Sequence, residues 1–420
     1  MKRLSILAVA SLAVMAALWA GTGVSAAATG SVPATVVPPG TLLASLSDPG
    51  GRLGDSFGNA VAVDGNTAVV AGYATGPGVV YIYEKGKAGW PTSPNVTLVG
   101  PAGADLFGNA VAINGNTIVV GAYGTTVGTN FSEGAAYIYV KTKSGWPTTP
   151  TASLYDPAAT TGDTFGSAVA VAPTTDSRTN VIVGASGTYP SPGAAYIYVR
   201  RLGQRWPTQP TTTLADPAAT AGDYFGGAVA ISADTAVVGA LNGNAAYVYA
   251  RKHLGGWPTK PATTLTDPAA SSGDQFGNAV ALDGHTLVVG ADFTNGAQGA
   301  AYVYTRGKSG WPSTPTVSLA DPLSSTNDEF GVSVAVDGPA LVVGSDEANA
   351  TGAAYSYHQG KKGWPTSPTT TINDPGPSSS YPGDRFGSAV GLASNSVVVG
   401  AFFTYGSYYG SIGAAYIFTP

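Results

Sequence analysis

Hydrophobic and polar positions along the chain follow a pattern that repeats seven times. Each unit begins with Asp-x-Phe-Gly and small or branched residues, continues with a Val-Val-Gly-type run, and then reaches a segment like Gly-Ala-Ala-Tyr-x-Tyr. A Trp-Pro-Thr-x-Pro segment and a Thr-rich stretch ending in Leu follow in six units. The Asp-x-Phe-Gly segments occupy residues 55–58, 105–108, 163–166, 223–226, 274–277, 328–331 and 384–387. Short apolar runs separated by turn residues predict four β-strands per unit.

The composition of the four predicted strands sets their order within a unit. Strand 1 is predicted over the Phe-Gly-x-Ala-Val-Ala-Val segment, which is rich in Ala and Gly, as expected where strands crowd around a central axis. Strands 1 and 2 are apolar on both faces, which is typical of a sheet sandwiched between other sheets. Asp64-Gly65 and Asn114-Gly115 predict tight hairpins between strands 1 and 2. We expect strand 4 to begin with two prolines and to form the outer edge, where proline is tolerated.

The chain ends indicate a closed ring. Strands 1, 2 and 3 occur seven times, but the Trp-Pro-led strand 4 occurs only six times, and the sequence stops after Ala414–Phe418. Thr41–Leu46, followed by Ser-Asp-Pro, matches the missing strand 4 and would complete the last unit. The sequence therefore predicts an all-β fold: a seven-bladed β-propeller of four-stranded antiparallel blades, closed by an N-terminal strand that completes the last blade.

The N-terminus has the pattern of a secretory signal peptide. Lys2 and Arg3 precede the apolar run Leu4–Ala20, and Val24-Ser25-Ala26 forms a small-x-small cleavage site. An uncleaved membrane anchor is the alternative. We expect a signal peptide at 1–26, a linker at 27–40 and the propeller at 41–420, in a secreted, extracellular protein without a membrane span in its mature part. The absence of Cys means that burial and hydrogen bonds hold the fold together.

The repeated Phe-Gly and Gly-Ala elements resemble those of the FG-GAP repeat family, which the integrin α-subunit head shares with many exported bacterial proteins. The resemblance extends over all seven units. Integrin-type repeats often carry an Asp-rich calcium loop between strands 1 and 2. Here these loops lack the closely spaced acids that such a site requires. Neither a metal nor a cofactor is therefore expected.

Catalytic motifs are not recognisable in the sequence. His253, His285 and His358 fall in three different blades, and no nucleophile elbow, paired-His motif or phosphate-binding loop is present. We therefore predict no catalytic residues, although an active site assembled at the axial mouth from several blades stays open. The Asp of each Asp-x-Phe-Gly is expected to cap its own turn. The repeated Trp and Tyr-x-Tyr residues are expected to pack the blades, with lectin-like aromatic platforms as the alternative.

Aromatic residues outside the repeat suggest a binding site. They lie in the loops between strands 2 and 3, and exposed rings on loops over a rigid scaffold are typical of binding surfaces. The alternative is that these rings fold back onto the rim. The candidate ligand-binding residues are Phe402, Phe403, Tyr405, Tyr408, Tyr409, Tyr123, Phe131 and Tyr189.

These features favour a secreted, non-catalytic binding or adhesion-like module. Its site is expected on the face that carries the strand 2–3 and 4–1 connections, here called the top face. A carbohydrate-binding propeller lectin and an extracellular polysaccharide-acting enzyme are the alternatives. We expect an unknown protein or glycan ligand, no specific nucleic acid, and a monomeric protein.

Charge differs between the two predicted faces. The top connections hold 18 acidic and two basic residues, whereas the strand 1–2 and 3–4 connections of the opposite, lower face hold 15 basic and six acidic residues. We predict an acidic top face and a basic lower face, the latter suited to an anionic cell-surface polymer. The alternative is that turn Asp and solubilising Lys simply occur where each loop type favours them.

Overall fold

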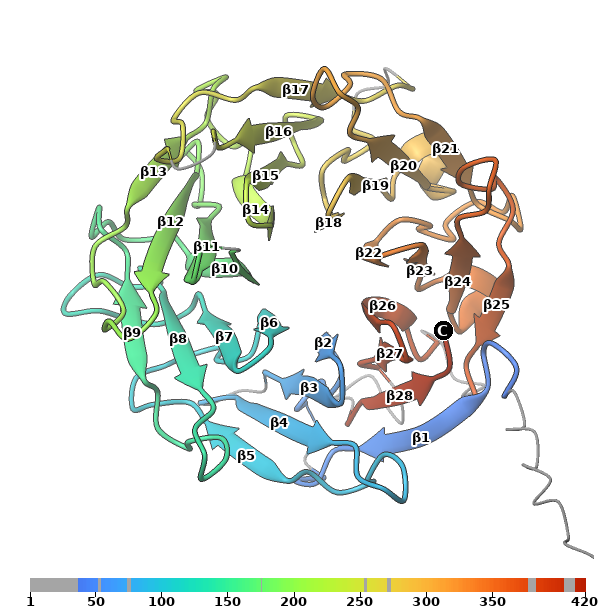
Figure 1. Ribbon diagram of the computed structural model, residues 1–420, viewed down its shortest axis with the longest axis horizontal. Helices are drawn as coiled ribbons and strands as arrows, with labels where there is room; N and C mark the ends of the chain where they lie inside the picture. Colours follow the sequence, from blue (N-terminus) through green and yellow to red (C-terminus); the bar gives the residue numbers. More distant parts are fainter. Residues whose placement is uncertain are drawn as a thin grey trace, which may run out of the picture. The chain divides into compact units, whose positions relative to one another are not determined.

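The computed structural model describes residues 37–51, 54–73, 77–174, 176–252, 255–269, 273–376, 383–403 and 412–420. The signal peptide predicted at 1–26 and most of the linker predicted at 27–40 lie outside these residues. The compact unit Pro38–Pro420 contains seven four-stranded sheets, each paired antiparallel in the order inner, second, third and outer strand. The sheets form the blades of a ring around a central opening (Figure 1). The predicted fold class is therefore confirmed.

The two inner strands of each blade are built from different residues. The innermost strands are β2 (Ala60–Asp64), β6 (Val111–Asn114), β10 (Phe165–Pro173), β14 (Phe225–Ile231), β18 (Val280–Asp283), β22 (Ser333–Asp337) and β26 (Phe386–Ala393). The second strands are β3 (Thr67–Gly72), β7 (Thr117–Ala122), β11 (Arg178–Ala185), β15 (Thr235–Ala240), β19 (Thr286–Ala291), β23 (Ala340–Ser345) and β27 (Ser396–Ala401). The second strands are almost wholly buried between neighbouring blades. The innermost strands are less uniform: β6, β18 and β22 are half-exposed along the central channel, whereas β14 and β26 are mostly buried.

The two outer strands complete each blade. The third strands are β4 (Val79–Glu84), β8 (Ala135–Val140), β12 (Ala194–Arg201), β16 (Ala245–Ala250), β20 (Ala300–Thr305), β24 (Ala353–His358) and β28 (Ala414–Phe418). The outer strands are β5 (Val96–Val99), β9 (Ala152–Tyr155), β13 (Thr212–Ala215), β17 (Thr263–Thr266), β21 (Val317–Ala320), β25 (Thr370–Asn373) and β1 (Leu42–Ser47). The blades are numbered 1 to 7 in chain order, so that blade 1 contains β2–β5 and blade 7 contains β26–β28 and β1. Two short helical turns, α1 (Thr294–Ala297) and a 3₁₀ turn (Ala348–Ala350), lie in the strand 2–3 loops of blades 5 and 6.

The first and last strands of the unit close the ring. β1 pairs antiparallel with β28, with Leu46 opposite Ala415 and Ser47 opposite Ala414. The N–H of Thr419 donates to the carbonyl of Thr41, 2.9 Å away. The predicted closing strand, Thr41–Leu46, is shifted by one residue from the observed one and has the predicted role.

The hydrophobic core is divided among the blade interfaces. Seven clusters of buried side chains each combine residues of two neighbouring blades. Between blades 1 and 2, for example, Ile82 and Leu98 share a cluster with Ile118 and Trp146. Because each blade is covered on both faces only by its neighbours, the ring depends on being closed.

Phe-Gly and Gly-Ala, the two elements that mark each repeat, meet across the blade interfaces. Gly134 at the start of strand 3 in blade 2 bridges Phe165 of blade 3. A Cβ on Gly134 would lie 2.1 Å from the Phe165 carbonyl oxygen, and a Cβ on Gly166 would lie 2.3 Å from that of Ala135. Both glycines also have φ above +90°. The backbones therefore approach too closely for any side chain, which explains both motifs.

Two details of the predicted strands are wrong. The outer strands do not begin with the two prolines: β13 starts at Thr212, after Pro210, because a proline nitrogen cannot donate to the strand ladder. The innermost strand begins at the Phe of Asp-x-Phe-Gly only in β10, β14 and β26, where the register shifts after that residue. In the other four blades the strand starts three or four residues later.

Candidate functional site

The strand 2–3 loops of the top face are fixed by the following blade. In blade 2, the Phe131 carbonyl accepts a hydrogen bond of 2.9 Å from the N–H of Gly162, which belongs to the strand 4–1 connector of blade 3. In blade 5, the Ala297 carbonyl accepts a bond of the same length from Glu329 of blade 6. The backbone of these loops is therefore held in place by hydrogen bonds to the next blade, and so are the positions of the side chains that the loops bear.

The predicted aromatic residues differ in exposure. Phe131 and Tyr189 are 71% and 77% exposed. Tyr123 is half-buried, and Phe402 and Phe403 are also half-buried, with ring centroids 4.7 Å apart. Tyr405, Tyr408 and Tyr409 lie outside the described residues. Among the described rings of this set, the contact is that between Phe402 and Phe403, and none joins Phe131, Tyr189 and Tyr123 into one cluster.

One variable position of the top face escaped the sequence analysis. The second residue of Asp-x-Phe-Gly has a left-handed backbone in every blade, with φ between 46° and 57°. These residues are Ser56, Leu106, Thr164, Tyr224, Gln275, Glu329 and Arg385. One strained conformation therefore carries seven unlike side chains, among them the partly exposed ring of Tyr224. Its variability inside an otherwise constant motif is the signal that could have revealed it.

The strand 4–1 connectors contain a repeated pair of aspartates. Six of them carry one Asp in an Asp-Pro dipeptide and a second Asp before x-Phe-Gly, and in blade 2 the first position is Gly100. The pairs are Asp48/Asp55, Asp156/Asp163, Asp216/Asp223, Asp267/Asp274, Asp321/Asp328 and Asp374/Asp384. The first carboxylate accepts backbone N–H groups two and four residues ahead, as Asp216 does from Ala218 and Thr220, both at 3.0 Å.

In four of the blades the Asp of Asp-x-Phe-Gly does not cap its own turn, contrary to expectation. No backbone N–H in the described ranges donates to the side chains of Asp163, Asp223, Asp274 or Asp328; the Asp of Asp-Pro, at the start of the turn, takes these bonds. The second carboxyl lies against the first. Burial, together with Asp156, raises the pKa of Asp163 to about 6, and burial with Asp267 raises that of Asp274 to about 6. Each such pair shares a local environment that disfavours two negative charges.

The repeated Tyr and Trp residues pack the blades, as expected. The six described Trp side chains and both members of each Tyr-x-Tyr pair are buried. The first Tyr of a pair contacts the Phe of Phe-Gly, and the Tyr81 hydroxyl donates to Asp48 Oδ1 at 3.0 Å. Basic side chains stack over Trp90, Trp146, Trp206, Trp257 and Trp311. Because their faces are covered, these rings do not provide the aromatic platforms of the lectin alternative.

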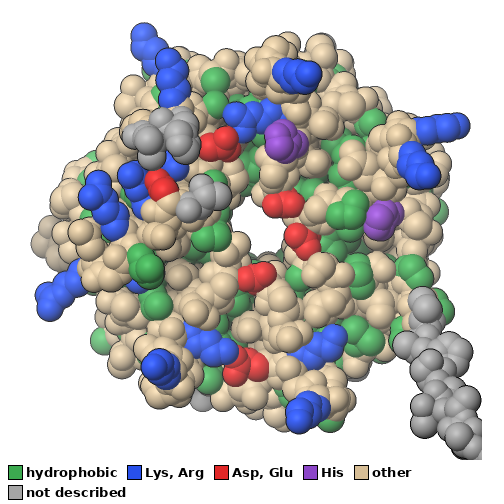
Figure 2. Space-filling view, viewed as in Figure 1, with side chains coloured by type: hydrophobic (Ala, Val, Ile, Leu, Met, Phe, Trp, Pro, Cys, Tyr) green, Lys and Arg blue, Asp and Glu red, His purple; other side chains and the backbone are tan. Residues whose placement is uncertain are grey.

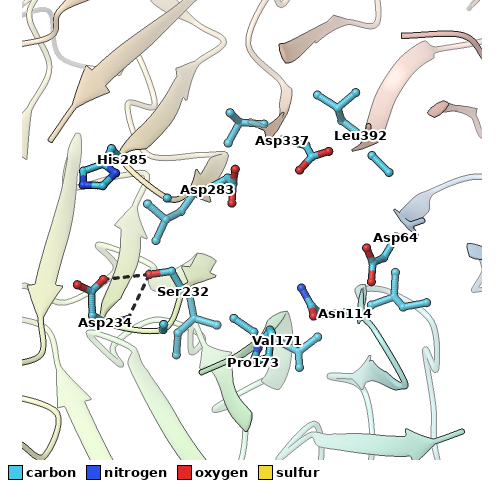
Figure 3. A pocket seen from close by; sticks show the side chains of 18 of the residues that line it. Asp64, Asn114, Val171, Pro173, Ser232, Asp234, Asp283, His285, Asp337 and Leu392 are labelled. Carbon is cyan, nitrogen blue, oxygen red and sulfur yellow. Dashed lines mark hydrogen bonds between the residues drawn. The ribbon is translucent and has the colours of Figure 1, made fainter. Parts of the chain in front are cut away.

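A polar cavity of about 870 Å³ lies at the lower mouth of the central channel. All seven blades line it through their strand 1–2 turns. Figure 3 shows Asp64, Asn114, Asp283 and Asp337 around this space, with Ser232 and Asp234 at one side. In the sequence these residues belong to separate hairpin turns, so the cavity that they form together was not predicted.

Hydrogen bonds between blades hold the acids of this cavity. Asp283 Oδ2 accepts the Gly338 N–H of the next blade at 2.8 Å. Burial, followed by the charges of Asp283 and Asp64, raises the pKa of Asp337. Burial acts most strongly on Asp234 and would raise its pKa. The 2.8 Å bond and the charge of Arg306, together with hydrogen bonds from Thr235 and Ser232, outweigh burial and lower this pKa. The mouth therefore offers carboxylate and amide groups to a polar ligand.

The lower face is more complex than the predicted basic surface. Four of its six acids, Asp64, Asp234, Asp283 and Asp337, line the central cavity. Figure 2 shows acidic side chains around the opening and most Lys and Arg side chains toward the outer rim. Charge on this face is therefore arranged radially, because acids favour the strand 1–2 turns whereas Lys and Arg follow strand 3.

The remaining candidate chemistry is sparse. His285 lines the lower cavity, His358 lies exposed at the end of β24, and His253 lies outside the described residues. In the part of the chain that the structure describes, no three His, Cys, Asp or Glu side chains are grouped to hold a metal ion. The described helices are all too short to cross a lipid bilayer.

Comparison with known proteins agrees with the fold. The FG-GAP repeat family model matches residues 97–139, 210–249 and 262–304. Sqt1 from Chaetomium thermophilum is similar in structure, with a TM-score of 0.50, 15% identity, and coverage of 90% of this chain and 88% of Sqt1. A protein from Lactobacillus plantarum has a TM-score of 0.50 and 14% identity, covering 75% of this chain and 84% of that protein. At such identities the likeness concerns the fold alone. No curated protein matches the sequence.

Proposed function

Because the chain is a seven-bladed β-propeller of FG-GAP repeats, we propose that it acts as a secreted, non-catalytic binding module whose ligand contacts the top face. The propeller fold and its repeats fit a binding module. The observation that carries the location of the site is the exposure of Phe131 and Tyr189 on loops that the next blade anchors. Exposed aromatic side chains on fixed loops provide contact area with little loss of conformational entropy on binding.

The test compares exposed rings in two places. Phe131→Ser and Tyr189→Ser together should leave the Tm within about 1 °C of wild type, because surface changes seldom alter stability, and should abolish binding to the native ligand. Tyr155→Ser is the matched control, since Tyr155 is 44% exposed but lies on the outer strand β9. Unchanged binding by the double variant, or equal loss in the control, would refute a top-face site.

The nature of the ligand can be established with the labelled chain on cells. Protease treatment of the cells should remove binding to a protein ligand, whereas glycosidase treatment should not. A positive glycan array would instead favour the lectin alternative. Release of product from polysaccharide mixtures would favour the enzyme alternative.

The lower cavity supports carbohydrate binding as a second candidate function. Its volume of about 870 Å³ and its carboxylate and amide side chains suit the hydroxyl groups of a small saccharide. Asp283→Asn with Asp337→Asn should then remove binding on a glycan array, while the Phe131 and Tyr189 variant keeps it. The opposite result would assign glycan binding to the top face.

A further inference from the structure

The strand 3–4 turns of blades 3 and 4, which are neighbours in the ring, differ from those of the other blades (Figure 1). In blades 1, 2, 5 and 6 the residue after strand 3 lies five positions before the Trp, as Lys85 does before Trp90. In blades 3 and 4 the separation is six, as from Arg200 to Trp206, and a second cation directly follows the first. Residues 199–211 and 250–262 contain no Asp or Glu. Their cations are Arg200, Arg201, Arg205, Arg251, Lys252 and Lys260, here called the blade 3–4 basic patch.

The two halves of this patch meet at the interface between the blades. Arg251 Nη2 of blade 4 donates to the carbonyl oxygen of Ala233 at 2.9 Å, and Asn180 Nδ2 of blade 3 donates to the same oxygen at 3.4 Å. The two residues before Asn180 on β11 pair with Arg200 and Arg201 on β12. The basic side chains of both blades therefore border one contact.

Two arginines of the patch are held in place by stacking. The guanidinium carbon of Arg200 lies 4.8 Å from the ring centroid of Trp206, and that of Arg251 lies 5.4 Å from the centroid of Trp257. Both arginines are half-buried, whereas the other four cations of the patch are exposed. A stacked guanidinium is positioned before an anion binds, and its planar donors match carboxylate or sulfate oxygens.

The acids beside the patch already have partners. Of the strand 1–2 turns in blades 3 and 4, Asp176 lies 3.2 Å from Arg178 Nε, and Asp234 lies 2.8 Å from Arg306 Nη1. None of the ion pairs in the described residues includes a cation of the patch. Six cations thus gather without an ion-paired carboxylate on a chain whose formal net charge is −5.

The surroundings of the cations favour one class of polyanion. Leu202, 76% exposed, is the one large apolar side chain that is exposed in the described residues of these two turns, which is too little to insert into a membrane. Trp206 and Trp257 are buried, so they do not offer rings on which nucleic acid bases could stack. We propose that the blade 3–4 basic patch binds an acidic polysaccharide, through the carboxylate or sulfate groups along its chain.

This surface is distinct from the top face that carries Phe131 and Tyr189. It borders the lower cavity, because Arg251 and Lys252 also line that cavity. A polysaccharide bound to the patch would therefore run along the lower rim, beside the acids around the central opening. Its binding should weaken with salt, since exposed charges are screened over about 8 Å at physiological ionic strength.

The test measures binding of the full chain to immobilised heparin, which carries both sulfate and carboxylate groups, at low and at physiological ionic strength. The triple variant Arg201→Gln, Arg205→Gln and Lys252→Gln should weaken binding about tenfold or more, because three exposed ionic contacts are each weak but add together. Its Tm should stay close to that of the wild type, because these side chains are exposed and form none of the described ion pairs.

A matched control removes the same charge from another part of the rim. Lys308→Gln, Lys361→Gln and Lys362→Gln together take three exposed cations from blades 5 and 6 and should weaken heparin binding less than about threefold. Equal losses in the two triple variants would overturn the proposal, because they would indicate diffuse attraction to the whole rim. Absence of heparin binding at low ionic strength would also overturn it.

Two further measurements separate this proposal from other ligands and sites. Binding to phosphatidylglycerol vesicles that is tighter than binding to heparin, and that Leu202→Ser abolishes, would overturn the proposal in favour of a membrane surface. The Phe131→Ser and Tyr189→Ser variant should retain heparin binding. Failure of the top-face proposal therefore leaves this one standing, and the reverse also holds.

Discussion

The blade interfaces and the strand 2–3 loops of the top face follow opposite rules. At the interfaces the same residues recur around the ring: Phe-Gly against Gly-Ala, and a buried Trp under a basic side chain. In the loops the blades differ, and exposed rings such as Phe131 and Tyr189 occur only once. The difference indicates that repetition here serves folding, whereas departures from the repeat mark surfaces available for binding.

Opening the ring should be the most damaging change to an interface. Deletion of Thr41–Leu46 removes most of β1 and exposes the edge of β28, so the protein should aggregate or lose cooperative unfolding. Leu46→Ala, a milder version, should cost about 3 kcal/mol of unfolding free energy, because Leu46 is fully buried. Leu42→Ala on the exposed side of the same strand is the control. A monomeric deletion variant with wild-type denaturant unfolding would show that closure contributes little.

A smaller but still large effect is expected where two blades touch through backbone. Gly166→Ala should cost several kcal/mol, since the new Cβ would meet the Ala135 carbonyl of the preceding blade. Gly65→Ala also has positive φ but nothing lies within 4 Å of its Cβ, so it should cost only about 1 kcal/mol. Chemical denaturation measures both. Equal costs would mean that backbone conformation, not blade contact, selects glycine at Phe-Gly.

The aspartate pairs should give the interfaces an unusual pH dependence. The folded-state pKa of Asp163 is about 6, above the value of about 3.9 in an unfolded chain. Between these values the folded protein holds a proton that the unfolded chain has released, so stability falls as pH rises from about 4 to 6. Thermal unfolding should show a Tm that decreases by a few degrees over this range.

Blade 2 provides the control for this effect. Asp163→Asn should make the pH profile flatter, because it removes one titrating group from the pair. Asp105→Asn should leave the profile unchanged, because Gly100 stands where the other connectors have their first Asp. A flatter profile in both variants, or in neither, would argue against coupling between paired carboxyls as the cause.

The sequence predicted what repeats and what visibly breaks the repeat. Four strands per unit and the closing role of the N-terminal strand follow from patterns that occur seven times, and Phe131 and Tyr189 stand out because they do not recur. Asp64, Asn114, Asp283 and Asp337 form one cavity only when the ring is closed, which no local pattern reveals. The aspartate pairs were missed although five of the six recur at a spacing of seven residues, because the Asp of Asp-x-Phe-Gly was considered alone and not together with the Asp of Asp-Pro.

The smallest expected effect separates interface from surface within a single turn. Lys141 lies over the Trp146 ring, 5.6 Å from its centroid, and pairs with Glu84 of blade 1, whereas Lys143 is exposed on the rim. Lys141→Gln should cost about 0.5–1 kcal/mol, because a cation–π contact and a half-exposed ion pair are both weak. Lys143→Gln should leave stability unchanged, but should weaken any salt-sensitive binding to an anionic polymer such as heparin, as rim charges act mainly on encounter. Denaturation curves and heparin binding at two salt concentrations measure the two effects, and a loss of stability only in Lys143→Gln would reverse the assignment of interface and surface.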